Sequence, residues 1–204
     1  MEQKHILINI GRQFGAGGKG VAALLGERLG IPVYDGELLQ KAAEESGFSP
    51  AIFRKSDEKR RLWRFGGLFG LNRASSYAPS AIDGTELFKF QSQAIRDLAQ
   101  KGSAVFVGRA SDYVLRDMEC LDVFICAPLE DRVRRVCERT GMDAAEAEKY
   151  ILRKEKARKE YYNFFTFGNW GVASNYDLCL DSSRLGIEGC AEVVIDFGRR
   201  AGLI

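Results

Sequence analysis

The chain has 204 residues, of which 30 are lysine or arginine, 28 are aspartate or glutamate and one is histidine, giving a formal net charge of +2. This length suits one domain, with or without insertions, and a substantial core. A net charge so close to zero argues against nucleic acid and against an anionic membrane as partners. The single histidine, His5, stands a whole strand before the polar turn that follows, so Ser-His-Asp and Cys-His catalysis are not expected.

The five cysteines are scattered along the chain without a C-x-x-C pair. An odd number in this arrangement indicates neither a disulfide framework nor a zinc site. Cys126 and Cys179 fall in predicted strands and are expected to be small buried side chains. The apolar runs are too short for a membrane span and the N-terminus leads straight into a strand, so no signal peptide or membrane anchor is expected. Together these features predict a cytoplasmic protein.

The turn at residues 11–20 is the organising feature of the sequence. It follows an apolar strand at 5–10 and precedes a helix in which apolar residues recur on one face up to residue 29. Glycines allow the backbone to approach a ligand closely, and a helix start presents N–H groups and a positive dipole end to an anion. The order of strand, glycine-rich turn and helix therefore predicts phosphate binding.

The turn departs from the strict nucleotide pattern G-x-x-x-x-G-K-[ST], whose hydroxyl holds Mg²⁺. Gly18 and Lys19 form the G-K pair, but Gly20 and Val21 follow in place of a hydroxyl residue. Gln13 stands where the pattern begins with glycine. A glycine-rich turn without a ligand is the simpler alternative, but the flanking strand and helix favour phosphate binding.

The rest of the chain alternates strands and helices. Strands are predicted at 31–35, 103–107, 121–126 and 176–180, and helices at 38–46, 87–101, 112–115, 129–140, 143–162 and 188–200, with a loop at 74–85. Strands separated by helices predict an α/β fold with a parallel sheet and helices on both faces. Ligands bind at the carboxyl ends of such strands, where Asp35, Arg109 and Asp181 join the glycine-rich turn.

Residues 54–73 mix basic and aromatic side chains. Such a mixture can bind nucleic acid by stacking and phosphate contact, but it also describes a solvated helix face followed by a packing loop. Asp57 and Glu58 dilute the charge, so a flap over a substrate or a contact between copies of the chain is favoured over nucleic acid. The sequence is therefore compatible with a homo-oligomer.

Seven segments resemble the cytidylate kinase-like family and follow one another in the same order over nearly the whole chain. They are residues 10–18, 32–35, 107–113, 127–132, 157–162, 175–178 and 185–188. The resemblance implies the three-layer P-loop fold of nucleoside monophosphate kinases, with a five-stranded parallel sheet. It further implies a single domain built from a core (1–35, 101–137, 173–204), a monophosphate-binding insertion (36–100) and a lid (138–172).

The resemblance also implies transfer of the γ-phosphoryl group of ATP to a nucleoside monophosphate such as CMP or dCMP, with Mg²⁺. The glycine-rich turn would hold ATP, the lid arginines would cover the transferred group, and Arg109 would position the acceptor, because an arginine fork pairs two phosphate oxygens. Asp35 and Asp112 are candidates for contact with the acceptor or the metal, against a role as helix caps. The implied donor-binding residues are Gly15, Ala16, Gly17, Gly18, Lys19 and Gly20; the implied catalytic residues are Lys19, Arg12, Arg132, Arg153 and Arg158; and the implied acceptor-binding residues are Asp35, Arg109, Asp112 and Arg135.

The chain departs from the family pattern at the positions that correspond to the metal ligands of these kinases. Aligned without a gap, the P-loop lysine falls on Gly18 and the magnesium hydroxyl on Gly20. With one inserted residue, Lys19 takes the lysine role and Val21 replaces the hydroxyl. Val107 stands where these kinases carry an acid before Gly-Arg, and no metal ligand is assigned.

Arg12, inside the turn, is a candidate for the missing positive charge, against a surface pair with a carboxylate. Phosphoryl transfer depends on cations that neutralise charge on the moving group, so the departures weaken the case for catalysis more than the case for binding. Two alternatives to a nucleoside monophosphate kinase stay open. One is a kinase of another small metabolite, and the other is a nucleotide-binding regulator with little or no kinase activity.

Overall fold

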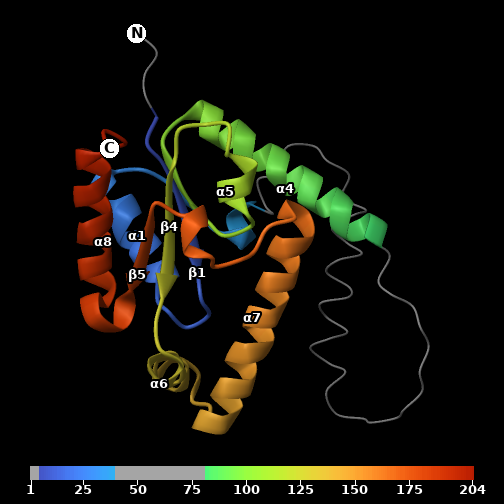
Figure 1. Cartoon of the computed structure of the whole chain (residues 1–204), viewed down its shortest axis with the longest axis vertical. Helices are drawn as coiled ribbons and strands as arrows, with labels where there is room; N and C mark the ends of the chain where they lie inside the picture. Colours follow the sequence, from blue (N-terminus) through green and yellow to red (C-terminus); the bar gives the residue numbers. More distant parts are fainter. Residues whose placement is uncertain (1–4, 40–80) are drawn as a thin grey trace.

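The computed structural model describes residues 5–39 and 81–204, the latter with side chains from residue 84 onward (Figure 1). At its centre five parallel strands pair in the order β2-β3-β1-β4-β5, with helices on both faces. The strands are β1 (Leu7–Arg12), β2 (Val33–Tyr34), β3 (Ala104–Val107), β4 (Leu121–Cys126) and β5 (Leu178–Asp181). This arrangement confirms the predicted three-layer α/β fold.

Helices connect the strands of the described segments. They are α1 (Gly18–Leu29), α4 (Ala81–Lys101), α5 (Ser111–Val114), α6 (Leu129–Thr140), α7 (Ala144–Thr166) and α8 (Ser182–Arg200), with a 3₁₀ turn at Ala173–Asn175. Of these, α6 and α7 follow one another between β4 and β5. The loop predicted at 74–85 is wrong for residues 81–85, which form the start of α4. That first turn holds Gly84, a poor helix former, and the apolar periodicity begins only after it. The predicted helix at 38–46 and the basic–aromatic segment 54–73 lie largely or wholly outside the described residues.

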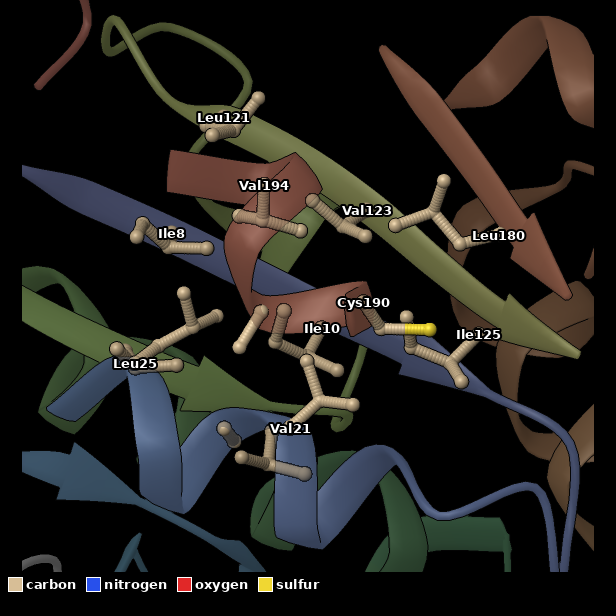
Figure 2. Close-up of a cluster of buried hydrophobic side chains, with 14 of the residues drawn as sticks. Ile8, Ile10, Val21, Leu25, Leu121, Val123, Ile125, Leu180, Cys190 and Val194 are labelled. Atoms are coloured by element: carbon tan, nitrogen blue, oxygen red, sulfur yellow. The ribbon is translucent and has the colours of Figure 1, made fainter. Parts of the chain in front are cut away.

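The face of the sheet toward α1 and α8 carries the larger apolar core (Figure 2). Side chains alternate along a strand, so Ile8 and Ile10 point together to this face, while Leu7 and Asn9 point to the other. Helix α1 contributes Val21 to this layer. The remaining members labelled in Figure 2 are Leu25, Leu121, Val123, Ile125, Leu180, Cys190 and Val194.

The opposite face of the sheet packs against α4 and α5 through Phe106, Ile95 and Leu115, all fully or almost fully buried. β5 lies at the edge of the sheet, and Cys179 on it is exposed, so the expected burial of that side chain is wrong. All five cysteines are free. Within residues 5–39 and 81–204, no helix combines the length and apolar character needed to cross a membrane.

The five parallel strands end at one edge of the sheet, where the chain passes from β1 into α1 and from β4 into α6. From the end of α6, helix α7 runs back to α4 (Figure 1). There Phe165 of α7 stacks on Phe88 of α4 with ring centroids 4.1 Å apart. The carboxyl edge of the sheet is therefore bordered by two charged helices, α6 and α7.

Candidate functional site

Residues 13–17, called the glycine loop below, connect β1 to α1. Gly15 and Gly17 both have φ of +84°, a conformation that residues with a side chain rarely adopt. Four backbone amides, those of Gly15, Gly17, Gly18 and Lys19, donate to no acceptor in the described part of the chain. Unpaired amides and the positive end of the helix dipole attract an anion. The loop thus presents free donors where the sequence predicts a phosphate.

The neighbouring strand β4 holds the start of the glycine loop. The amide of Gln13 donates to the carbonyl of Ile125 at 3.0 Å. Its side-chain Oε1 accepts from the amide of Ala127 at 3.1 Å. Gln13 was not among the predicted site residues, although its place between the glycines of the turn marks it as part of the loop.

Arg132 of α6 braces the loop from the other side. This buried side chain donates Nε to the carbonyl of Ala127 at 2.9 Å and Nη1 to the carbonyl of Phe14 at 3.4 Å. Its Nη1 also lies 2.8 Å from a carboxylate oxygen of Glu155 on α7. In this conformation its donors are engaged by the protein itself.

A buried serine that the sequence analysis missed joins the glycine loop to α6. Ser182, at the start of α8, places its Oγ 2.6 Å from the carbonyl of Ala16 and 3.2 Å from that of Cys126. Arg135 donates Nη1 to the same Oγ and Nη2 to the Ser182 carbonyl, each at 2.8 Å. Arg135 therefore contacts the loop indirectly, through Ser182. The strand-end position of Ser182 was the only hint in the sequence.

Arg12, the last residue of β1, lies along the glycine loop between two glycines. A Cβ built on Gly18 would lie 2.6 Å from the Arg12 Cβ and 2.9 Å from its Cγ. At the other end of the side chain, a Cβ on Gly108 would overlap Nη1 of the guanidinium. Arg12 thus spans the distance from the start of α1 to the end of β3, and both neighbours must be glycine for it to do so.

Arg12, Arg109 and Arg158, called the arginine cluster below, gather at this point. Arg158 of α7 donates Nη1 to the Arg12 carbonyl at 3.1 Å. Burial, and then the charges of Arg158 and Arg109, lower the pKa of Arg12 to about 9, with Asp35 opposing them. Burial and the charge of Arg109 also lower the pKa of Arg158. The carboxyl edge of the sheet therefore carries a concentration of positive charge.

The Lys19 side chain reaches the end of β2. Its Nζ lies 2.7 Å from Oδ2 of Asp35, and the Lys19 side chain is 65% exposed. The other carboxylate oxygen of Asp35 accepts from the amides of Glu37 and Leu38 at 3.0 and 3.2 Å. Burial raises the pKa of Asp35, but these three hydrogen bonds outweigh it and leave that pKa below its ordinary value. Asp35 is thus a helix cap and an ion-pair partner at once.

The end of β3 has an unusual backbone. Gly108, Arg109 and Ala110 have φ values of +72°, +61° and +53°, and the last two carry side chains. Left-handed residues with side chains cost on the order of 1 kcal/mol or more each and concentrate at functional sites. The turn directs the Arg109 guanidinium toward Gly36, where a Cβ would lie 2.9 Å from Nε, and over the ring of Tyr161 at 5.7 Å.

Phe14, at the tip of the glycine loop, joins it to both charged helices. Its ring meets that of Tyr150 edge-on, with centroids 5.2 Å apart. The guanidinium groups of Arg158 and Arg139 lie over the Phe14 ring at 5.1 and 5.7 Å. Arg153 lies over the far partner, Tyr150, at 5.5 Å and is exposed. Arg153 is therefore the most peripheral of the predicted arginines.

Asp112 is engaged in a buried polar group near the middle of the sheet. Tyr162 donates its hydroxyl to Oδ2 of Asp112 at 2.7 Å, and burial raises the pKa of Asp112 despite this hydrogen bond. Asn9 donates Nδ2 to Oδ1 of Asp122 at 2.8 Å. Asp112 and Asp122 influence each other electrostatically. The half-buried Asp112 carboxylate is thus engaged by Tyr162 within the protein.

The structure brings five predicted residues together at one place. They are Arg12, Lys19, Asp35, Arg109 and Arg158. Two predicted arginines, Arg132 and Arg135, support the glycine loop from α6. Arg153 and Asp112 make their described contacts elsewhere.

Magnesium does not fit the residues of the described site. A Cβ on Gly20 would lie 3.0 Å from the Ile187 side chain, and Val21 is buried in the core rather than directed at the loop (Figure 2). Asp35, the carboxylate next to the loop, is taken up by Lys19 and two amides. Within the described segments, no group of three or more His, Cys, Asp or Glu side chains forms a metal site. These residues offer a protein-held metal neither a hydroxyl nor a free carboxylate.

Comparison with solved structures finds the same fold in other proteins. An uncharacterized protein from Eubacterium ventriosum superposes with a TM-score of 0.73 at 27% identity, covering 94% of this chain and 97% of that one. Shikimate kinase from Bacteroides thetaiotaomicron reaches a TM-score of 0.53 at 12% identity, with 94% and 97% covered. At such low identity the second match shows the fold alone.

Comparison with curated sequences is more specific. The cytidylate kinase of Methanopyrus kandleri is 29% identical over 189 residues, which cover 88% of this chain and 86% of that protein. The cytidylate kinase of Pyrococcus horikoshii is 26% identical over 196 residues, covering 95% and 88%. The family model described as the cytidylate kinase-like family matches residues 7–184. These matches support a nucleotide kinase, and the chain belongs to the cytidylate kinase-like family.

Proposed function

We propose that this protein is a cytoplasmic phosphotransferase that moves the γ-phosphoryl group of ATP to a nucleoside monophosphate, with CMP or dCMP as acceptor. The observation that carries the proposal is the arginine cluster beside the free amides of the glycine loop. Clustered positive groups that form no ion pair within residues 5–39 and 81–204, next to a helix N-terminus, suit a site for several phosphate groups. The family match and the curated relatives named cytidylate kinase support the choice of acceptor.

In this proposal the glycine loop and the first turn of α1 (residues 15–20) hold the triphosphate of ATP. Arg109 and Asp35, at the ends of β3 and β2, face the acceptor side, and Arg158 brings positive charge from α7. We assign residues 138–172 as the lid and 36–100 as the monophosphate-binding insertion, of which residues 40–80 lie outside the described structure.

The chemistry needs no covalent intermediate. An oxygen of the acceptor phosphate forms a bond to the γ-phosphorus while the bond to the bridging oxygen of ADP breaks. The chain contributes orientation of the two phosphates and stabilisation of the negative charge that spreads over the transferred group. Mg²⁺ would arrive with ATP, because Gly20 and Val21 offer it no hydroxyl and Asp35 is engaged by Lys19.

A coupled assay of ADP release tests the proposal with the full chain, ATP and a panel of CMP, dCMP, UMP, AMP and GMP. Turnover with cytidine monophosphates above the ATPase background is expected. Transfer only to another phosphate-bearing or hydroxyl-bearing metabolite would replace the acceptor class. Tight ATP binding by calorimetry without transfer to any acceptor would contradict the proposal and favour a nucleotide-binding regulator.

A further inference from the structure

We infer that Arg12 supplies the positive charge to the donor phosphates that a lysine supplies in the strict P-loop pattern, and that Lys19 is not the main source of that charge. The inference rests on the proposed function and deepens it, because it assigns the cation of the same donor site. Three independent features of the described residues support it: the space that Arg12 occupies, its lack of a partner, and the direction of Lys19.

The first feature is the space around position 18. Aligned without a gap, the P-loop lysine falls on Gly18, the first residue of α1. A side chain there would start 2.6 Å from the Arg12 Cβ and would run into its Cγ at 2.9 Å and its Cδ at 3.6 Å. The Arg12 stem therefore fills the volume into which a lysine at position 18 would extend, and it approaches the loop from β1 instead of α1.

The far end of Arg12 lies where donor and acceptor would meet. A Cβ on Gly108 would overlap its Nη1, so the guanidinium reaches the end of β3 directly before Arg109. Arg12 thus starts beside the glycine loop, which offers amides to the donor, and ends beside the arginine proposed for the acceptor. A planar guanidinium at this junction can pair with oxygens of two phosphate groups at once, which a lysine ammonium cannot do with the same geometry.

The second feature is the absence of an anionic partner for Arg12. Across residues 5–39 and 81–204, its guanidinium has no hydrogen-bond acceptor and no ion-pair partner, and its Nε is buried. Its charged neighbours include two further arginines, Arg158 and Arg109, and, with a smaller effect, the carboxylate of Asp35. A buried donor without an acceptor beside like charges is costly, and such a cost is recovered when a polyanion binds.

The third feature is the direction of Lys19. Its ammonium is 2.7 Å from Asp35, an ion pair that ties the start of α1 to the end of β2. Contact with a triphosphate in the loop would require this pair to break. Arg12 has no such ion pair to break within the described residues, where its stem lies beside the glycine loop and its guanidinium lies at the end of β3.

The first experiment measures the affinity of the full chain for ATP in EDTA and again with excess Mg²⁺, by calorimetry. Arg12→Met keeps a long stem against Gly18 and removes the charge, and we expect its ATP affinity in EDTA to fall roughly 10-fold or more, as for the loss of a charge-assisted contact. Lys19→Met should cost less than roughly 3-fold, as for a mostly exposed pair. Arg28→Met is the matched arginine control, because Arg28 pairs with Glu188 and Glu192 on the surface, and its affinity should equal that of the wild type.

A second experiment moves the charge back to position 18. Arg12→Gly removes both the charge and the side chain that blocks this position, and Gly18→Lys is then added to the same chain. We expect the double variant to bind ATP at least several-fold more tightly than Arg12→Gly alone, because Gly18 has an ordinary helical backbone. Thermal unfolding of each variant identifies any that fail to fold, and Arg12→Lys provides a further charged variant without the fork.

The outcomes separate this inference from the proposed function. A wild-type chain that binds and transfers phosphate, with Lys19→Met losing more ATP affinity than Arg12→Met, overturns the inference and leaves the function standing. If the folded double variant binds ATP no more tightly than Arg12→Gly alone, the inference that Arg12 replaces a lysine at position 18 is overturned. A folded wild-type chain that binds no nucleotide overturns both. A loss of ATP affinity in Arg12→Met, together with a gain of ATP affinity when Gly18→Lys is added to Arg12→Gly, supports the inference even if the acceptor is not a cytidine nucleotide.

Discussion

Lys19 and Asp35 form an ion pair of 2.7 Å that fastens the beginning of α1 to the strand end of β2. The same carboxylate caps the helical turn after it through the amides of Glu37 and Leu38. One acidic side chain thus holds together the two segments that lie on either side of the proposed phosphate site. Its orientation is fixed before any substrate arrives, which suits a residue facing the acceptor.

Replacing Asp35 by Asn should destabilise the protein in a pH-dependent manner. The folded-state pKa of Asp35 lies below its ordinary value of 3.8, so its contribution to stability is present above that value and is lost as the pH falls through the folded pKa. At pH 7 we expect Asp35→Asn to lower the free energy of unfolding by about 1 kcal/mol, since the pair is partly exposed and one oxygen also caps a helix. Urea denaturation between pH 7 and pH 3 measures the difference.

The matched control is Asp196→Asn, which breaks the exposed pair with Arg200 of 2.8 Å on α8. That change should cost no more than a few tenths of a kcal/mol. An Asp35 variant that is as stable as the wild type at pH 7, or whose deficit grows toward acid pH, would show that the carboxylate is not held as described.

Arg109→Met should act on the acceptor and spare the donor. The guanidinium projects from a left-handed turn toward Gly36, which follows β2, and toward Tyr161 of α7. We expect the KM for the monophosphate to rise roughly 10- to 100-fold, the size of a lost charge-assisted phosphate contact, with ATP affinity unchanged within about 3-fold. Arg116→Met, which removes a guanidinium stacked 4.3 Å from Tyr113, should leave both constants as they are. A loss of ATP affinity equal to the change in acceptor KM would contradict this division.

Ser182→Ala should loosen the glycine loop without touching a substrate. The change leaves the carbonyls of Ala16 and Cys126 without their hydroxyl donor and Arg135 without one acceptor, all in a buried place. We expect a loss of roughly 1–3 kcal/mol in the free energy of unfolding and a higher KM for ATP, with acceptor KM unchanged. The control is Ser183→Ala, which removes a hydroxyl that donates to Asp181 at 2.7 Å, and it should cost less than about 1 kcal/mol. Equal effects of the two variants would remove the special role of Ser182.

The parallel sheet was predictable because buried parallel strands are typically continuous apolar runs, as in Ala104–Val107 and at residues 123–126. The exposure of Cys179 was not predictable from composition. It depends on β5 being the edge strand, which is a matter of strand order and not of local sequence. The early start of α4 was not predicted for a related reason, because the sequence of its first turns lacks an apolar repeat.

The location of the candidate site could be predicted from the sequence, but the contacts within it could not. Arg132, Arg135 and Arg158 are all candidates for the lid arginines that the family resemblance implies, and their contacts in the structure distinguish them. Arg132 meets Glu155 and Arg135 meets Ser182, residues brought near by the fold, whereas Arg158 reaches the end of β1. Tertiary contacts therefore decide which arginine faces a ligand and which one supports the backbone. The sequence pattern alone does not distinguish the two roles.

The ionised Asp122 carboxylate should destabilise the protein at neutral and alkaline pH, and this effect should be relieved in mild acid. Burial raises the pKa of Asp122 to about 6, helped by the charges of Asp112 and Asp177 and opposed by the hydrogen bond from Asn9. Because the folded pKa exceeds the unfolded one, the ionised group destabilises the fold above pH 6, and this penalty is relieved as the pH falls from 6 toward 4. Asp122→Asn keeps an oxygen for Asn9 and should be more stable than the wild type at pH 8, by at most ~3 kcal/mol. The advantage should shrink as the pH is lowered to 5 in parallel urea denaturations, and an advantage that is constant with pH, or absent at pH 8, would contradict the assignment.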